Sequence, residues 1–148
     1  EDIFREAIHH LGRNKRNHNI SMHLEDDLLM ANMDARLIIQ VLVNLINNAI
    51  KYTPENSNIS LNARRVEDKI LIEVQDDGNG VLHPDQLFEM FYTENNRGGD
   101  TRRGMGLGLS LCKSIIQSHG GTIWVENVTP HGACFKFVLD AVEVKLYE

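Results

Sequence analysis

The sequence contains no apolar run that approaches the ~20 residues needed to cross a bilayer as a helix, and it shows no signal-peptide pattern. It has only two cysteines, Cys112 and Cys134, which stand far apart in apolar surroundings and outside any metal-binding or redox spacing. We therefore expect both to be reduced core residues in a cytosolic setting. An excess of positive charge is also absent, because the net charge is −6. This argues against nucleic-acid binding as the main function.

A single domain is the simplest organisation for 148 residues, of which 42% are hydrophobic and 24% are charged. That length is enough to bury a proper core. The chain does not begin with methionine, and we expect it to be a fragment of a larger protein. Because the net charge is negative, a polyanionic ligand would have to be met by a local group of cations and a metal ion.

An amphipathic helix is predicted between a cap at Asp34 and a stop at Pro54. Its apolar residues recur at a spacing of three to four, and amides with one lysine line the opposite face. Amide oxygens can ligate Mg²⁺ and a lysine can meet a phosphate, although a solvated face rich in asparagine is an equally good interpretation of this stretch. The apolar face consists of Leu37, Ile38, Val41, Leu42, Leu45, Ile46 and Ala49, and the polar face of Gln40, Asn44, Asn47, Asn48 and Lys51.

The other elements are predicted from the same periodicities. Helices are expected within residues 1–17, 81–91 and 107–119, the first running into a basic loop and the last ending at a glycine C-cap. Strands are expected at 19–25, 28–32, 59–63, 70–74, 122–126 and 133–139. Residues 141–148 are either a further strand or a frayed tail.

The strand that contains Ile70, Ile72 and Val74 places Asp76 on the same inner face, because side chains alternate with a period of two. A buried carboxylate is costly unless it is hydrogen-bonded. The glycines of Asp76-Asp-Gly-Asn-Gly80 let the backbone turn sharply and approach a flat ligand closely. A plain Asp-Gly hairpin turn is the competing interpretation.

Residues 92–103 are polar and exceed the usual length of a connection, which is typical of a lid. The loop carries Arg97, Arg102 and Arg103, and a solvated loop with scattered arginines is the alternative. It ends in Gly104-Met-Gly-Leu-Gly108, where a glycine-rich turn before a helix N-terminus suits phosphate. The turn lacks the preceding strand of a dinucleotide-binding turn and the Gly-Lys-Ser/Thr of a P-loop, so both of those folds are disfavoured.

In this order, the motifs resemble the catalytic ATP-binding domain of sensor histidine kinases, a branch of the GHKL superfamily. The resemblance covers nearly the whole chain. It implies the Bergerat fold, an α/β two-layer sandwich in which a mixed sheet is covered on one face by about three helices. Residues 1–148 would form one domain, with a leading helix in 1–17 and an ATP lid at 92–106. The motifs are Asn44–Thr53 (N box), Asp76–Gly80 (G1 box), Leu87–Phe91 (F box) and Gly104–Gly108 (G2 box).

The resemblance also implies a role for each motif residue. Asn48 would ligate Mg²⁺ on ATP with help from Asn44, and Lys51 would contact phosphate. Tyr52 would pack near the adenine, and Asp76 would accept a hydrogen bond from its amino group. Gly78 and Gly80 would let the backbone approach the base, while the G2 glycines anchor the lid. The whole implied nucleotide site is Asn44, Asn48, Lys51, Tyr52, Asp76, Gly78, Gly80, Val81, Phe88, Arg97, Gly104, Gly106, Leu107 and Gly108, with Lys51 and Asn44 catalytic.

The function that this resemblance implies is delivery of the ATP γ-phosphate to a histidine on a separate dimerisation domain. Members that hydrolyse ATP, such as gyrase, carry glutamate at the position of Asn44, so its absence points to phosphoryl transfer. Many histidine kinases have an acidic residue where Asn47 stands, which puts a proton-handling role there in doubt. His9 and His10 lack the setting of a phosphoacceptor, so the fragment should bind ATP without carrying its own substrate.

The same resemblance implies the partners: a dimerisation and phosphoacceptor domain and, indirectly, a response regulator. The full protein would be a homodimer, attached to a membrane, with this domain in the cytoplasm. The segment His131–Phe135 is similar to potassium-responsive sensor kinases. Two alternatives share the boxes: an anti-sigma-factor-like serine kinase, and a degenerate GHKL module that serves protein interaction without binding nucleotide.

Overall fold

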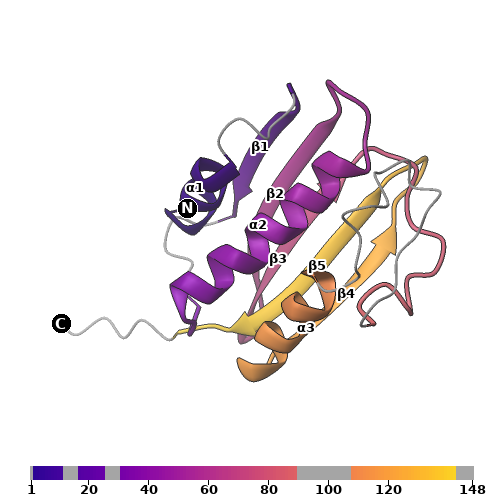
Figure 1. The fold of residues 1–148 in the computed structure, drawn as a ribbon. Helices are drawn as coiled ribbons and strands as arrows, with labels where there is room; N and C mark the ends of the chain where they lie inside the picture. The colour runs from indigo at the N-terminus through magenta and orange to yellow at the C-terminus, as the bar shows by residue number, and fades with distance from the viewer. Residues whose placement is uncertain (1, 12–16, 26–30, 90–107, 143–148) are drawn as a thin grey trace.

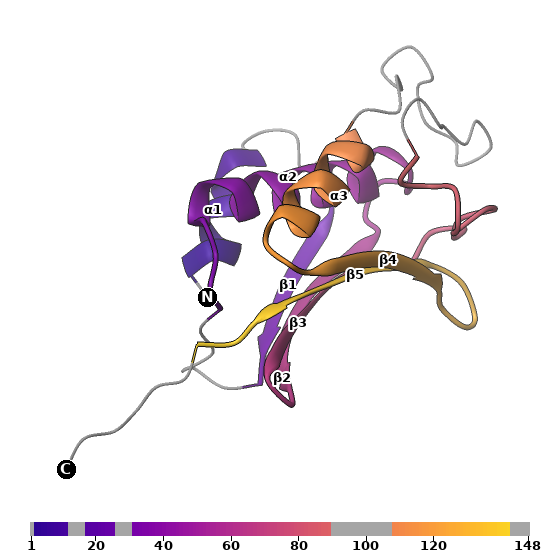
Figure 2. The same ribbon diagram turned by 90° about the horizontal axis from the view of Figure 1, so that it is seen from below.

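The computed structural model describes residues 2–11, 17–25, 31–89 and 108–142. These residues form a mixed five-stranded sheet with helices packed on one of its faces (Figures 1 and 2). The predicted fold class, an α/β two-layer sandwich, is confirmed. In chain order the elements are α1 (Asp2–Leu11), β1 (Asn19–Leu24), α2 (Ala35–Lys51), β2 (Asn58–Val66), β3 (Lys69–Asp76), α3 (Gly108–Ser118), β4 (Thr122–Asn127) and β5 (Ala133–Asp140).

The strands lie in the order β1-β2-β3-β5-β4. β1 and β2 are parallel and are connected through α2, whereas the other neighbouring strands are antiparallel. Figure 2 shows α1, α2 and α3 side by side above the curved sheet. The central strands β3 and β5 therefore run beneath the helices, and the turn that follows β3 comes close to the C-terminal end of α2.

Helix α2 has the amphipathic character that its spacing predicts. Asp34 caps the N-terminus, with its carboxylate accepting a hydrogen bond from the Arg36 N–H at 3.0 Å. The helix ends at Lys51, three residues before Pro54. Its exposed residues include Leu37, at 37% exposure, although the periodicity assigned this leucine to the apolar face. The buried face comprises Ile38, Val41, Leu42, Leu45, Ile46, Ala49 and Ile50.

The strand pattern is also confirmed, because alternate residues of β2, β3 and β5 point into one core. Asp76 pairs with Ile59 across the β2–β3 ladder, so the carboxylate lies in line with the buried apolar residues of that face. Both cysteines are free and buried, as expected of core residues. Burial raises the pKa of each thiol to about 12. The largest fully buried side chains are Phe135, Phe137, Leu11, Ile38, Leu42, Leu45, Ile46, Ile59, Leu61, Ile116 and Leu139.

The predicted helix at 81–91 is wrong for the residues that the structure describes, 81–89. Hydrogen bonds there reach only three residues back, from the Gln86 N–H to the His83 carbonyl and from the Glu89 N–H to the Gln86 carbonyl, both at 3.0 Å. The segment is a series of turns. Leu87 and Phe88 are adjacent and both buried. A helix of this length is marginal by its own hydrogen bonds, so the packing of these two side chains decides the local structure.

Two other predictions fall mainly on residues that the structure does not describe. The strand expected at 28–32 lies there except for its last two residues, of which Ala31 forms an isolated bridge with Ala141. The lid at 92–106 lies outside it entirely. Within the described part of the chain, no helix is long and apolar enough to cross a membrane.

The end of α3 is tied to the start of α2 through His119. The imidazole Nδ1–H donates to the Ile115 carbonyl at 2.8 Å, and Nε2 accepts the Asp34 N–H at 3.0 Å. The predicted glycine C-cap is confirmed: Gly120 has φ +75°, and the Gly121 N–H donates to the Ile116 carbonyl at 2.9 Å. The C-terminal end of α3 therefore lies at the N-terminal end of α2.

We expect His119→Ala to lower the free energy of unfolding by about 1–2 kcal/mol, because it removes two hydrogen bonds and leaves the Asp34 N–H without its acceptor. Urea unfolding followed by circular dichroism measures this change. His23→Ala, at an exposed position of β1, is the control. Equal stability of the two variants would contradict a structural role for the His119 bridge.

Candidate functional site

The predicted residues of the G1 motif lie where β3 ends, beside the end of α2 and the start of β5. Among the charged residues that the structure describes, Asp76 is the most buried, at 2% exposure. Its Oδ1 atom accepts two backbone hydrogen bonds, from the Gly78 N–H at 2.9 Å and from the Ala133 N–H at 3.2 Å. Because both backbone donors use Oδ1, the carboxylate is held in one orientation while Oδ2 takes no part in either bond.

Gly132 allows β5 to approach this carboxylate. Its φ is +125°, and a Cβ atom there would lie 2.2 Å from the backbone oxygen of Asp76. The neighbouring His131 also joins the turn before β5 to the residue that follows β3: its Nδ1–H donates to the Asp77 carbonyl at 2.8 Å. The first residues of β5 and the turn before it thus fix the end of β3 from one side.

The glycines of the G1 motif are required first of all by contacts within the chain. A Cβ on Gly78 would lie 2.7 Å from Thr53 Cγ2, and one on Gly80, which has φ +80°, would lie 2.5 Å from Asn127 Oδ1. Asn127 also pairs with the next residue, Val81. Its Oδ1 accepts the Val81 N–H at 2.7 Å and its Nδ2 donates to the Val81 carbonyl at 2.9 Å. The end of β4 therefore holds the far side of the motif.

The polar face of α2 lies against α3 on one side. The Asn44 side chain lies beside the Cys112 thiol, where its hydrogen bond lowers the thiol pKa against the larger, opposite effect of burial. The Cys112 thiol lies 3.8 Å from the Val41 carbonyl. One turn further along α2, the Asn48 Nδ2 atom is buried and has no hydrogen-bond partner among the described residues. A buried amide N–H without an acceptor is costly, so this atom is suited to a ligand.

At the end of α2, the Lys51 ammonium lies 5.0 Å from the centre of the Tyr52 ring. Such a cation–π contact holds the ammonium near the C-terminal end of the helix. The Tyr52 carbonyl lies 3.6 Å from the place where a Gly78 Cβ would be, so N box and G1 motif are in contact.

Other predicted residues are placed differently or lie outside the description. Phe88, at 8% exposure, packs edge-to-face on Phe135 with ring centroids 5.9 Å apart, as a core residue would. Gly108 is exposed as the first residue of α3, and a Cβ there would contact nothing within 4 Å. The positions of Arg97, Gly104, Gly106 and Leu107 lie outside the described residues, so their roles stay predictions.

The donor set in the described residues does not resemble a metal site made by protein alone. No group of three or more His, Cys, Asp or Glu side chains occurs in that part of the chain with a geometry that could hold an ion. In this region, the oxygen atoms that could ligate a cation belong to the side-chain amides on α2. That composition fits Mg²⁺, which keeps waters and takes few protein ligands when substrate phosphates supply the others.

Sequence reasoning missed four residues around the site: Thr53, Asn127, Gly132 and His18, whose Nε2 lies 2.7 Å from Thr53 Oγ1. Thr53 closes the N box and directly contacts Gly78, but a threonine at the end of a helix carries no special signal. Asn127 looks like any polar residue at the end of a strand. Gly132 could have been suspected from its place before a strand, whereas nothing local distinguishes His18.

Comparisons with known proteins agree with this geometry. The family model described as histidine kinase-, DNA gyrase B-, and HSP90-like ATPase matches residues 33–143. The sensor protein KdpD of Clostridium acetobutylicum is 37% identical over 139 residues, which are 93% of this chain but 15% of KdpD.

Solved structures give the same result. The catalytic domain of the histidine kinase ThkA, in a nucleotide-free form, superimposes with a TM-score of 0.80 at 30% identity, covering 94% of this chain and 92% of that domain. ThkA in complex with the response regulator TrrA gives a TM-score of 0.78 at 29% identity, covering 95% of this chain and 40% of the kinase. The chain thus spans a minor part of the longer relatives and nearly all of the isolated catalytic domain.

Proposed function

The chain belongs to the family of histidine kinase-, DNA gyrase B- and HSP90-like ATPases, and we propose that it binds Mg²⁺-ATP for transfer of the γ-phosphate to a histidine on another domain. One observation carries the proposal: the buried Asp76 carboxylate, fixed through Oδ1 by two backbone N–H groups. Oδ2 of Asp76 would accept the adenine amino group, an interaction that guanine, with a carbonyl oxygen at that position, cannot provide.

The phosphates would extend from Asp76 along the polar face of α2. Asn48 would meet them with its amide: Nδ2 would donate to a phosphate oxygen, and Oδ1 would be a ligand for Mg²⁺. Asn44 would assist with its side-chain oxygen. Lys51, at the helix end, would contact phosphate. Mg²⁺, when bound, neutralises phosphate charge.

Phosphoryl transfer is favoured over hydrolysis because Asn44 cannot act as a general base. An amide has no useful basicity at neutral pH, so it cannot take a proton from an attacking water. Activation would rest on positioning and charge neutralisation, with the acceptor supplied by a dimerisation domain. ThkA, a relative of the same fold, has been solved with a response regulator, and we propose such a protein as the next carrier of the phosphate.

The 37% identity with the sensor protein KdpD supports a sensor kinase of that type. A response to potassium, which the resemblance of His131–Phe135 implies, is part of the proposal. We further propose that the domain works in the cytoplasm, as part of a homodimeric sensor attached to a membrane.

Calorimetric titration with ATP, with and without Mg²⁺ and beside GTP, tests the proposal. Binding that is selective for ATP and strengthened by Mg²⁺ is the expected result. A folded protein that binds neither nucleotide would identify a degenerate interaction module. Rapid hydrolysis would overturn the argument from Asn44, and phosphorylation of a partner on serine would identify a serine kinase.

Replacing Asn48, whose Nδ2 has no hydrogen-bond partner among the described residues, should affect stability and ATP binding in opposite directions. Asn48→Leu replaces a buried N–H that lacks an acceptor by an apolar group of similar size, so without nucleotide the free energy of unfolding should stay equal or rise by up to about 1 kcal/mol. Affinity for Mg²⁺-ATP should fall at least about tenfold, because one charge-assisted bond and one metal ligand are lost.

Urea unfolding without nucleotide and calorimetry with Mg²⁺-ATP measure the two effects of Asn48→Leu. Gln40→Leu, at an exposed position of the same helix, is the matched control and should leave ATP affinity within about twofold of wild type. A variant of Asn48 that is destabilised without nucleotide would show that the amide serves the fold.

A further inference from the structure

A hydrogen bond between two buried polar side chains lies behind the G1 motif. His18 and Thr53 are 7% and 5% exposed, and the distance from His18 Nε2 to Thr53 Oγ1 is 2.7 Å. The Thr53 hydroxyl has one proton, which it donates to the Ala49 carbonyl at 2.7 Å. The hydroxyl must therefore accept from His18, so Nε2 of this imidazole carries a proton.

The two hydrogen bonds fix the rotamer of Thr53, and the rotamer fixes where its methyl group lies. That methyl group, Cγ2, would be 2.7 Å from a Cβ on Gly78, so it occupies the space that the missing side chain leaves. Gly78 in turn donates its N–H to Asp76 Oδ1. An unbroken series of contacts thus leads from His18 through Thr53 and Gly78 to the carboxylate.

We propose that His18 and Thr53 are positioning residues for the adenine end of the nucleotide site. The inference rests on the proposed function, since it takes Asp76 as the acceptor for the adenine amino group. Without the bond from His18, Thr53 can change rotamer, its methyl group leaves Gly78, and the Gly78 N–H no longer holds Asp76 in one orientation. The phosphate end, on α2, does not depend on these contacts.

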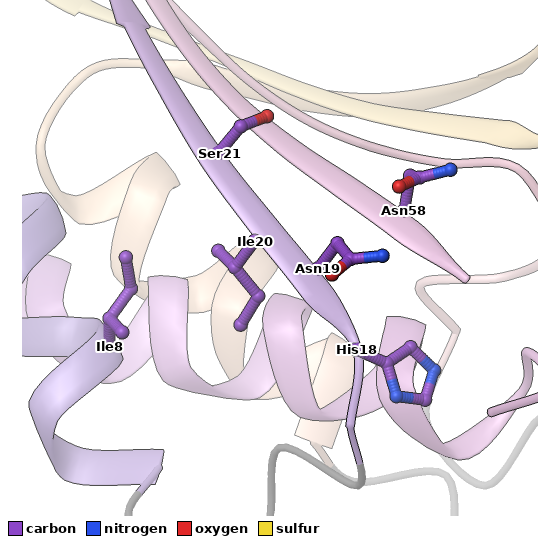
Figure 3. A pocket seen from close by; sticks show the side chains of 6 residues that line it. All are labelled: Ile8, His18, Asn19, Ile20, Ser21 and Asn58. Atoms are coloured by element: carbon purple, nitrogen blue, oxygen red, sulfur yellow. The ribbon is translucent and has the colours of Figure 1, made fainter. Parts of the chain in front are cut away.

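His18 lies at the edge of the sheet, close to a second residue that is hydrogen-bonded to the G1 motif. His18 precedes β1 and borders a cavity of about 350 Å³ between α1 and the first residues of β1 and β2 (Figure 3). Asn58 lines the same cavity and is itself bonded to the G1 motif: its N–H and Nδ2 donate to the Asp77 carboxylate at 3.1 and 3.0 Å. The cavity is lined by Ile8, His18, Asn19, Ile20, Ser21 and Asn58.

Two variants of His18 distinguish a role in positioning the adenine end of the site from a general role in the stability of the fold. His18→Phe keeps a ring but removes the donor, whereas His18→Gln keeps an N–H donor close to the place of Nε2. Each is titrated with Mg²⁺-ATP and with Mg²⁺ and inorganic tripolyphosphate, a probe that has the phosphates but no base. His18→Phe should weaken ATP binding about fivefold and leave tripolyphosphate binding unchanged, and His18→Gln should bind ATP nearly as wild type does.

Other outcomes overturn the inference. Wild-type ATP affinity in His18→Phe would show that the bond is not needed, and an equal loss for both ligands would show a general loss of structure. If His18→Phe does not fold, Thr53→Ser serves in its place, because serine keeps the hydroxyl and its two hydrogen bonds but lacks the methyl group that lies against Gly78; it must show the same selective loss. Failure of the wild-type domain to bind ATP would refute the proposed function itself, a result distinct from any difference between variants.

Discussion

Replacing Asp76 by asparagine is expected to lower ATP affinity by about 100-fold, or ~3 kcal/mol, while the domain stays folded. The asparagine oxygen can take the place of Oδ1 and accept the N–H groups of Gly78 and Ala133. Its NH₂ group then stands where Oδ2 was and presents a donor to the donor of adenine. Binding loses a charge-assisted hydrogen bond and gains a repulsive contact, whereas the internal bonds survive.

Calorimetry with ATP and GTP, together with a thermal melt in the absence of nucleotide, measures this separation of binding from folding. Asp68→Asn makes the same chemical change at an exposed turn between β2 and β3 and should leave ATP affinity within about twofold of wild type. Normal ATP affinity in a folded Asp76→Asn protein would refute the assignment of Asp76 to the base.

The second large effect is expected for folding, from Gly132→Ala. The added Cβ would lie 2.2 Å from the Asp76 backbone oxygen, and φ at this position is +125°, where residues other than glycine are strained. Backbone atoms on a central strand cannot move aside as a side chain would. We expect the free energy of unfolding to fall by at least about 3 kcal/mol, enough to leave a marginal domain partly unfolded.

Gly120→Ala is the matched control for this experiment, because Gly120 also has positive φ, +75°, but a Cβ there would contact nothing within 4 Å. It should cost only about 1 kcal/mol, the conformational penalty alone. Urea unfolding of both variants separates the cost of backbone strain alone, in Gly120→Ala, from the cost of strain plus steric overlap, in Gly132→Ala. Equal losses would show that the approach of β5 to Asp76 can relax.

Much of the fold was predictable because burial leaves a periodic record in the sequence. The spacing of Leu42, Leu45 and Ile46 predicted α2, and the alternation of Ile70, Ile72 and Val74 predicted that Asp76 faces inward. The stretch 81–89 was not predictable in the same way. Two adjacent buried residues, Leu87 and Phe88, are compatible with a short helix or with turns, and the choice depended on packing against Phe135 from β5.

The sequence by itself therefore determined the class of fold, the polar stripe on α2 and the inward carboxylate, since each is encoded by residues within one helix or strand. Only the tertiary structure decided which residues from elsewhere support them: Thr53 in the space at Gly78, Gly132 against Asp76, and His18 behind Thr53. These contacts join segments far apart in the chain, and no local propensity or period specifies the partner. The physical reason is that close packing selects partners by shape and hydrogen-bond geometry, which exist only after the elements have come together.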